Sequence, residues 1–244
     1  MNRPPPASGR LLRTLHRWLA LVFVLPMAII GVTGAILQAI LAVYGEPAGP
    51  GGTWPASAMV PNWVVSLHDV VLKIHTGFFA GVAGAWYGLA CGVGLLFFSI
   101  SGVWMLAKMY LARFPRGGRS PFWGGGSSMR ALHRWLAAGL GAFALLVSFT
   151  GASLDFDFVR HDQVPGNGLP PSLHGTATLP PPPSGAHWHV LSFSLHKLDF
   201  LGVLGHGLGV VLGAGLATFA VSGLWMYLSM RRRRARAGQR GLFW

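Results

Sequence analysis

Residues 68–105 read HDVVLKIHTGFFAGVAGAWYGLACGVGLLFFSISGVWM, and residues 189–226 read HVLSFSLHKLDFLGVLGHGLGVVLGAGLATFAVSGLWM. The second segment aligns with the first at a displacement of 121 positions without a gap. Each copy begins with two histidines seven residues apart and ends in Ser-Gly-x-Trp-Met. The matched positions include His68 and His189, His75 and His196, Gly81 and Gly202, Gly84 and Gly205, Ser101 and Ser222, and Trp104 and Trp225. The chain therefore contains an internal repeat with equivalent histidines.

Two shorter motifs precede each copy and also occur twice. Residues 15–20 and 132–137 both read LHRWLA, and residues 33–35 and 150–152 both read TGA. These motifs recur at a displacement of 117 positions instead of 121. Each repeat therefore holds a histidine in LHRW, a Thr-Gly pair, two further histidines and a final Ser-Gly-x-Trp, in that order.

The apolar residues of the chain lie in long blocks. Hydrophobic residues make up 52% of the sequence and charged residues only 10%, a balance typical of integral membrane proteins. A helix needs about 20 apolar residues to cross a hydrocarbon core of roughly 30 Å. Four blocks are long enough, at approximately 15–44, 78–109, 132–154 and 200–228. The sequence predicts an all-α membrane protein with four transmembrane helices.

The charged residues are distributed unevenly around these blocks. Of nineteen Lys and Arg residues, sixteen lie before or at the start of the first block, from the end of the second block to the start of the third, or after the fourth. All six Asp and Glu residues lie on the opposite side of the spans. Basic residues next to spans stay in the cytoplasm, so both termini and the middle loop are expected there. The positive charge then reflects topology, which makes the lipid bilayer the expected partner and gives no reason to expect nucleic acid.

Two repeats that each begin and end in the cytoplasm are parallel repeats, related by a pseudo-twofold axis along the membrane normal. This topology divides the chain into five parts. They are a disordered cytoplasmic tail (1–10), the first repeat (11–112), a cytoplasmic loop (113–128), the second repeat with a Pro-rich outer loop (129–230) and a basic cytoplasmic tail (231–244). The first block is too long for a signal peptide and is expected to be retained.

The segment before the second span is too long to continue it as one straight helix. A continuous helix over 68–109 would be about 60 Å long, twice the hydrocarbon thickness. The segment is therefore expected to bend or project, and to place His68 and His75 at or above the outer interface.

Parallel repeats that pack face to face bring equivalent residues together at one depth. His16 and His133, the inner pair, would meet on the cytoplasmic side, and His75 and His196, the outer pair, on the opposite side. Two imidazole nitrogens on opposite faces of a plane are the axial ligands of a b-type haem. The pairs therefore predict one or two haem b groups, about 30 Å or more apart if there are two. Covalent attachment is excluded because there is one cysteine and no Cys-x-x-Cys-His.

Residues next to these histidines fit the haem hypothesis, and some also fit a simpler one. Arg17 and Arg134 follow the inner histidines and are placed to neutralise haem propionates. LHRW is also typical of an interfacial anchor that is basic and aromatic at the inner headgroups. The glycines beside the outer histidines either admit a flat macrocycle or allow close helix packing.

Three other histidines have less defined roles. His68 and His189 lie seven residues before the outer pair on the same helix face. They are expected to ligate, to bind a ferric substrate or to be solvated. His206 lies deep in the fourth span, where an ionisable residue is a functional candidate. Its counterpart is Ala85, so symmetry provides no partner, and a hydrogen bond or a charge relay is expected.

These motifs resemble the PepSY-associated transmembrane helix family, which includes iron-regulated membrane proteins and siderophore reductases. The matching residues are His16 with Thr33-Gly34, His133 with Thr150-Gly151, His75 with Ser101-Gly102, and His196 with Ser222-Gly223. The resemblance covers all four spans and implies a haem-containing protein of the bacterial inner membrane that passes electrons outward to chelated ferric iron. Fuller members carry a PepSY domain between spans. This chain has no sizeable one, so a partner or the Pro-rich loop is expected to recognise the substrate.

The leading hypothesis is a transmembrane b-type cytochrome that acts as a reductase of a ferric siderophore or another ferric chelate. A quinol or a cytoplasmic reductase is the expected electron donor at the inner pair. Nicotinamide or flavin binding is not expected because no Gly-rich dinucleotide motif is present. Two alternatives stay open. One is a membrane scaffold or assembly partner with structural histidines, and the other is a metal permease, which the scarcity of carboxylates in the spans disfavours.

Overall fold

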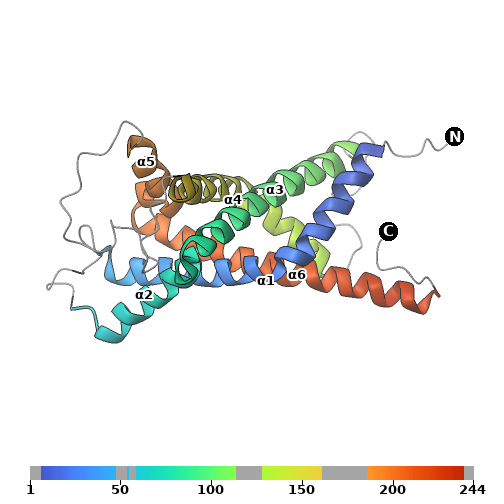
Figure 1. Cartoon of the computed structure of the whole chain (residues 1–244). Helices are drawn as coiled ribbons and strands as arrows, with labels where there is room; N and C mark the ends of the chain where they lie inside the picture. Colours follow the sequence, from blue (N-terminus) through green and yellow to red (C-terminus); the bar gives the residue numbers. More distant parts are fainter. Residues whose placement is uncertain (1–6, 48–53, 55–58, 114–127, 161–185, 239–244) are drawn as a thin grey trace.

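The computed structural model describes residues 7–47, 54, 59–113, 128–160 and 186–238, and every regular element within them is helical (Figure 1). The elements are α1 (Ala7–Tyr44), α2 (Asn62–Thr76), η2 (Phe78–Ala80), α3 (Gly81–Arg113), α4 (Ser128–Arg160), α5 (Ala186–Lys197), η5 (Asp199–Leu201) and α6 (Val203–Arg236). η2 and η5 are single 3-10 turns. The predicted cytoplasmic loop and the Pro-rich outer loop lie almost entirely outside the described residues.

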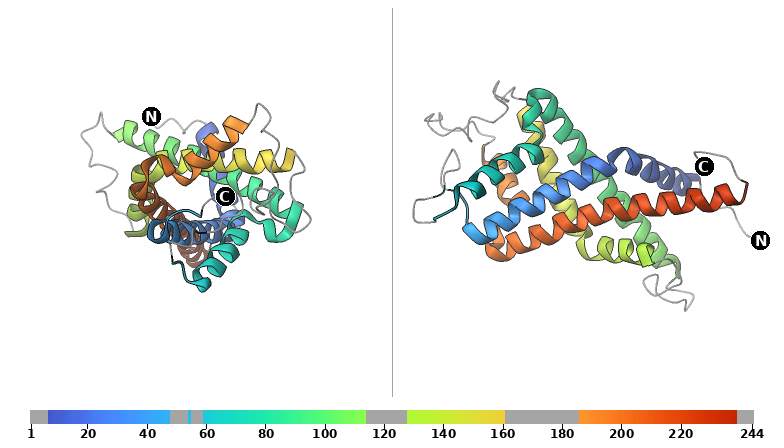
Figure 2. Two further views of the ribbon diagram at one scale, coloured as in Figure 1. Left: turned by 90° about the vertical axis from the view of Figure 1, so that its left-hand side faces the viewer. Right: turned by 90° about the horizontal axis from the view of Figure 1, so that it is seen from below.

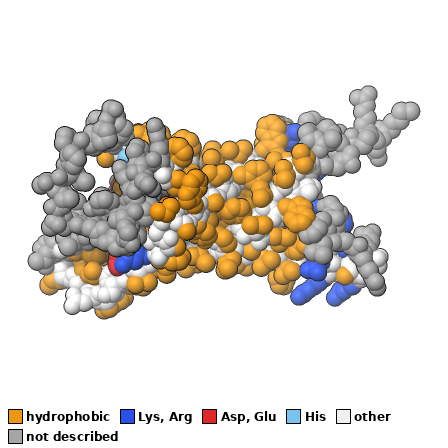
Figure 3. All heavy atoms as spheres, in the orientation of Figure 1, with side chains coloured by type: hydrophobic (Ala, Val, Ile, Leu, Met, Phe, Trp, Pro, Cys, Tyr) orange, Lys and Arg blue, Asp and Glu red, His pale blue; other side chains and the backbone are white. Residues whose placement is uncertain are grey.

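Four of the helices are long and apolar enough to cross a membrane. The candidate spans are Leu11–Tyr44, Phe78–Leu111, Ser128–Asp157 and Val203–Arg236. Only 17–22% of the most apolar window of each span is buried inside the protein, so most of this apolar surface faces outward, as lipid-facing helices require. Hydrophobic side chains cover the middle of the molecule (Figure 3). In the described residues, the predicted all-α fold is confirmed, as is the prediction of four helices long and apolar enough to cross a membrane.

Different helices lie at the two ends of the bundle. α1 begins and α6 ends at one end, and the short helices α2 and α5 lie at the other (Figure 1). α1 begins at Ala7, within the predicted tail, and α6 continues to Arg236, within the predicted basic tail. Arginines in the last turn of α6 interact favourably with the helix dipole, which explains why the helix runs beyond the apolar block.

The long helices pack in pairs that join the two sequence copies. α1 runs alongside α6, and α3 packs against α4 (Figure 2). A Cβ added to Gly31 would lie 2.7 Å from the carbonyl oxygen of Gly213, and one added to Gly92 would lie 3.0 Å from Cα of Ala152. Such backbone approach is typical of small residues at helix interfaces in membranes. The main interfaces therefore lie between the copies.

The predicted break before the second span is confirmed, and it recurs before the fourth. Gly77 and Gly81 adopt positive φ values of 75° and 58°, which separate α2 from α3. The equivalent break has Leu198 at φ 62° and Gly202 at φ 57°. A left-handed conformation costs a non-glycine residue about 1–2 kcal/mol. The Leu198 side chain is 1% exposed, and burial of a leucine contributes about 1.5–3 kcal/mol, which offsets that cost.

A glycine follows each break and permits close approach of the backbone there. A Cβ added to Gly84 would overlap the carbonyl oxygen of Gly77, and one added to Gly205 would overlap that of Leu198. No side chain fits at either position without moving backbone. The chain bends at each break, and α2 packs against α1 while α5 packs against α4, which places His75 and His196 against other helices.

Candidate functional site

The inner histidines are held by the Ser-Gly-x-Trp motifs of their own repeats. His16 Nδ1 lies 2.7 Å from Ser101 Oγ, and His133 Nδ1 lies 2.8 Å from Ser222 Oγ. The two serines are 2% and 1% exposed, so these hydrogen bonds are shielded from water. The serine of Ser-Gly-x-Trp therefore positions the histidine of LHRW.

The serine hydroxyls also determine which imidazole nitrogen carries the proton. Ser101 donates to the carbonyl oxygen of Phe98 at 3.3 Å, and Ser222 donates to that of Phe219 at 3.1 Å. Each hydroxyl has one hydrogen, so its oxygen must accept from the histidine. Nδ1 is then the protonated nitrogen, and Nε2 carries the lone pair. Metal-binding histidines are usually oriented in this way by a partner for their second nitrogen.

The outer histidines are held in the same way by the Thr-Gly motifs. His75 Nδ1 lies 3.0 Å from Thr33 Oγ1, and the threonine donates its own hydrogen to the carbonyl oxygen of Ile29 at 2.7 Å. His196 Nδ1 donates to the carbonyl oxygen of Val147 at 2.9 Å, with Thr150 Oγ1 at 3.4 Å. Nδ1 again carries the hydrogen. All four histidines therefore present Nε2 as the nitrogen able to bind a metal.

The glycine after each threonine lies directly against an outer histidine. A Cβ added to Gly34 would lie 3.0 Å from Cε1 of His75, and one added to Gly151 would lie 2.8 Å from Cε1 of His196. Carbon atoms in ordinary contact lie about 3.5–4.0 Å apart. The glycines thus let each ring approach the helix backbone. The repetition of Thr-Gly was the only signal of this role in the sequence.

The outer pair comes together as predicted from the repeat. The ring centres of His75 and His196 are 6.4 Å apart, and the ring planes are inclined by 53°. Histidine nitrogen binds a metal at about 2 Å, so two imidazoles on opposite sides of one ion have ring centres roughly 6 Å apart. The spacing therefore fits two histidines that hold one metal ion between them.

Burial keeps the outer histidines neutral. It lowers the pKa of His75 to about 4, with a smaller contribution from His196, and it also lowers the pKa of His196. A neutral imidazole is the form that binds a metal ion. Both rings therefore have the protonation state that ligation requires at neutral pH.

Thr33 locates the outer pair along α1. Thr33, which contacts His75, is eleven residues before the end of α1 at Tyr44, or about 16 Å along the helix. The placement of His75 relative to the outer interface stays a prediction. Thr33 also lies seventeen residues after His16, which places the inner and outer levels about 25 Å apart along α1.

The inner pair has aromatic walls and an unsatisfied arginine. His16 makes an edge contact with Phe98 at 5.2 Å between ring centres, and His133 makes one with Phe219 at 4.9 Å. The two histidines are close enough for their charges to interact. Nε and Nη2 of Arg134 are buried without a hydrogen-bond partner among the described residues. A buried unsatisfied donor costs about 1–3 kcal/mol, and a propionate next to His133 would satisfy it.

Arg17, the counterpart of Arg134, is in a different environment. Its side chain is exposed, and it has contacts of its own within the protein. Of the two arginines predicted to neutralise propionates, Arg134 therefore has the stronger need for an anionic ligand.

The two histidines seven residues upstream do not form a matching pair of contacts. The ring of His68 lies 5.0 Å from that of Trp54 in an edge contact, whereas His189 Nδ1 lies 3.6 Å from Asp157 Oδ2. Burial lowers the pKa of His68, although Asp69 opposes the effect. These different partners disfavour the hypothesis that His68 and His189 are a pair of ligands.

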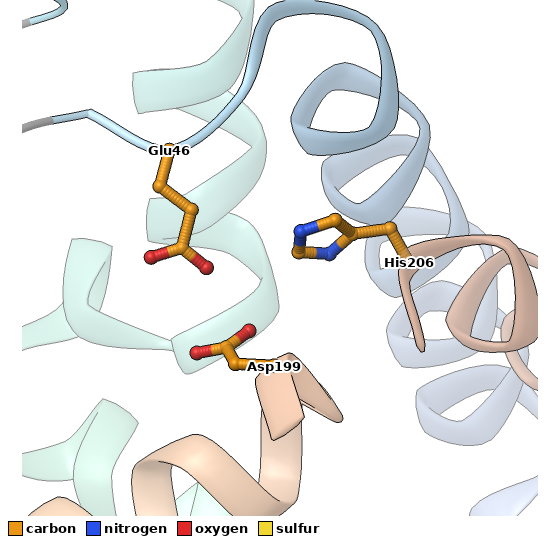
Figure 4. A group of neighbouring side chains, drawn as sticks. All are labelled: Glu46, Asp199 and His206. Carbon is orange, nitrogen blue, oxygen red and sulfur yellow. The ribbon is translucent and has the colours of Figure 1, made fainter. Parts of the chain in front are cut away.

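His206 makes a hydrogen bond, which is one of the two roles predicted for it. Its Nδ1 lies 2.9 Å from Oε1 of Gln38, and Nε2 of Gln38 donates to the carbonyl oxygen of Lys197 at 3.2 Å. His206 is 7% exposed and belongs to a cluster with Glu46 and Asp199 (Figure 4). Sequence reasoning missed this cluster because its members have no symmetric counterparts.

Comparison of the chain with models of protein families, with curated proteins and with solved structures gives no match. The resemblance to the PepSY-associated transmembrane helix family therefore rests on the repeated motifs. The contacts of the four motif histidines carry the functional inference.

Proposed function

We propose that this protein is a b-type cytochrome of the bacterial inner membrane that delivers electrons to a ferric siderophore or another ferric chelate in the periplasm. The observation that supports this most strongly is the outer pair. Two neutral histidines from equivalent positions lie 6.4 Å apart between ring centres, and Nδ1 of each is hydrogen-bonded.

In this proposal, His75 and His196 would hold an outer haem b, and His16 and His133 would hold an inner one. Haem b would supply one-electron chemistry at a potential set by its ligands and surroundings. Thr33 and the carbonyl oxygen of Val147 orient the outer imidazoles. Gly34 and Gly151 leave room for the rings, so that both keep the orientation needed for ligation.

The inner pair is completed by its serines and by Arg134. Ser101 and Ser222 orient the imidazoles, and Arg134 offers two buried nitrogens to an anion. The proposed topology has two parallel repeats with both termini in the cytoplasm. The concentration of arginines at the end of α6 supports this orientation. The donor is then a quinol or a cytoplasmic reductase, and the ferric chelate is the acceptor.

The test is an absorption spectrum with a haem count on protein purified from haem-supplemented cells. We expect a Soret band, sharp reduced α and β bands, and two haems per chain. His75→Ala and His196→Ala should each remove one haem, whereas the matched control His68→Ala should remove none. Reduced protein should be reoxidised by a ferric chelate. A colourless preparation would defeat the proposal, and one haem per chain would defeat its two-haem form.

A scaffold with structural histidines is the second candidate. It is favoured by the fact that His16, His133 and His75 each bond a hydroxyl of their own repeat, because such bonds also stabilise helix packing. In this case, His75→Asn would keep much of the packing and no bound cofactor would be lost. The haem count of that variant distinguishes the two functions.

A further inference from the structure

A second cluster of metal-binding side chains lies beside the outer pair, where α1, η5 and α6 meet. Glu46 follows α1, Asp199 opens η5, and His206 lies in the first turn of α6. One ligand atom from each residue lies within 4.8 Å of the other two. Figure 4 shows the three side chains converging on one space. The ligands of one ion are about 3–4 Å apart, so a small inward movement would complete a site.

A chain of hydrogen bonds fixes the proton on His206. The carbonyl oxygen of Lys197 can only accept, so Gln38 must donate through Nε2. Gln38 Oε1 is then an acceptor and receives the hydrogen of His206 Nδ1. Nε2 of neutral His206 therefore keeps its lone pair. This is the partner arrangement that orients histidine ligands in metal sites.

The cluster contains more acceptors than donors. Lys197 Nζ lies 2.7 Å from Glu46 Oε1 and 3.0 Å from Asp199 Oδ2. Oδ1 of Asp199 is buried with no hydrogen-bond partner among the described residues. Two carboxylates and one ammonium leave a net negative charge beside the histidine lone pair.

We infer that Glu46, Asp199 and His206 bind a divalent first-row transition-metal ion. One imidazole nitrogen and two carboxylates suit ions such as Mn²⁺ and Fe²⁺. Lys197 occupies the cation position in the metal-free protein and must leave the carboxylates when the ion enters. Its Nζ already lies 4.8 Å from the ring centre of Phe193, which provides an alternative place for the ammonium.

The position of this metal site gives it a role that rests on the proposed function. Lys197 directly follows His196, and Gln38 joins its carbonyl oxygen to His206. In the proposed function, the electron donor is a quinol or a cytoplasmic reductase. A ferric chelate that accepts one of these electrons becomes a ferrous chelate, which releases Fe²⁺. The cluster then binds the released Fe²⁺, and the ammonium of Lys197 moves aside.

The experiment is a titration of the detergent-purified full chain with Mn²⁺, in which electron paramagnetic resonance measures the free ion. We expect one saturable site. Asp199→Asn, His206→Gln and Glu46→Gln should each weaken binding by about tenfold or more, within the 10–100-fold range for loss of a group that supports a metal site. Lys197→Met should tighten binding because the competing cation is gone. The matched control Asp69→Asn removes a carboxylate that pairs with Lys73 only on the surface of α2, and it should change nothing.

Unchanged affinity in Asp199→Asn and His206→Gln, or the absence of a saturable site, would overturn the inference and leave the cluster a structural ion pair. If one of these variants does not fold, the opposite effects of Glu46→Gln and Lys197→Met still decide it. The haem count of each sample separates this result from the proposed function. Haem without a Mn²⁺ site refutes the metal site alone, and a Mn²⁺ site without haem refutes the cytochrome alone. Anaerobic Fe²⁺ should displace the Mn²⁺, and failure to do so would refute the role in iron release.

Discussion

Replacement of Gly151 by alanine tests whether the Thr-Gly motif shapes a ligand site. The new Cβ would lie 2.8 Å from Cε1 of His196, about 0.7 Å closer than the shortest ordinary carbon contact. The ring must move away from α4 by about that distance. Ligand sites tolerate displacements of about 0.5 Å, so the outer pair should lose its ligating geometry.

The expected magnitude follows from the cost of overpacking. Extra methyl groups in a packed region cost about 1–3 kcal/mol, which corresponds to roughly a 5- to 150-fold loss of affinity at the outer pair. Gly34→Ala should have a smaller effect because its Cβ would lie 3.0 Å from Cε1 of His75. The control is Gly223→Ala, at a glycine of the repeated motifs where a Cβ would meet nothing within 4 Å.

The assay measures haem content and the reduced absorption spectrum of each variant after purification in the same detergent. Gly151→Ala should lose the outer haem and keep the inner one, whereas Gly223→Ala should match the parent protein. If Gly151→Ala and Gly223→Ala have the same haem content and the same spectrum, His196 is not a ligand in the position described, and the reasoning fails.

Four other predictions follow from the same contacts. Acidification from pH 6.5 to about 4 should destabilise the protein. The pKa of His75 is about 4 in the folded chain and 6.5 in the unfolded chain, so the unfolded chain binds more protons in this range. The melting temperature of His75→Gln should therefore depend less on pH than that of the parent protein. Ser222→Ala should weaken haem binding at the inner pair, because loss of the partner of His133 costs about 1–3 kcal/mol. The control Ser153→Ala removes a hydroxyl that bonds a carbonyl oxygen of its own helix α4, and it should not weaken binding. Equal haem retention in the two variants would contradict this. Gly205→Ala should lower the yield of folded protein, because its Cβ would overlap the carbonyl oxygen of Leu198. The control Gly207→Ala places its Cβ in open space and should keep the parent yield. Size-exclusion chromatography measures the folded fraction, and similar elution profiles of the two variants would contradict the prediction. Arg134→Gln should raise the melting temperature of haem-free protein, since it removes two buried donors that have no hydrogen-bond partner among the described residues, and should weaken haem binding. The same sign in both forms would argue against an anionic ligand at Arg134.

The spans and the repeat were predictable because their signals are local. Hydropathy over about 20 residues reports the solvent of a helix, and a displaced alignment reports duplication without knowledge of packing. The candidate pairs could be listed for the same reason, since equivalent residues near an axis must meet if the repeats face each other. The break before α3 was also predictable from length, because one helix would be twice too long.

The contacts of the histidines required the tertiary structure. His16 bonds Ser101 across 85 residues, and His75 bonds Thr33 across 42, and these distances depend on how the glycine breaks redirect α2 and α5. The Glu46, Asp199 and His206 cluster was invisible in the sequence because it departs from the internal symmetry. Apolar periodicity is encoded along each helix, whereas a site made of polar side chains from three elements exists only where packing brings them together.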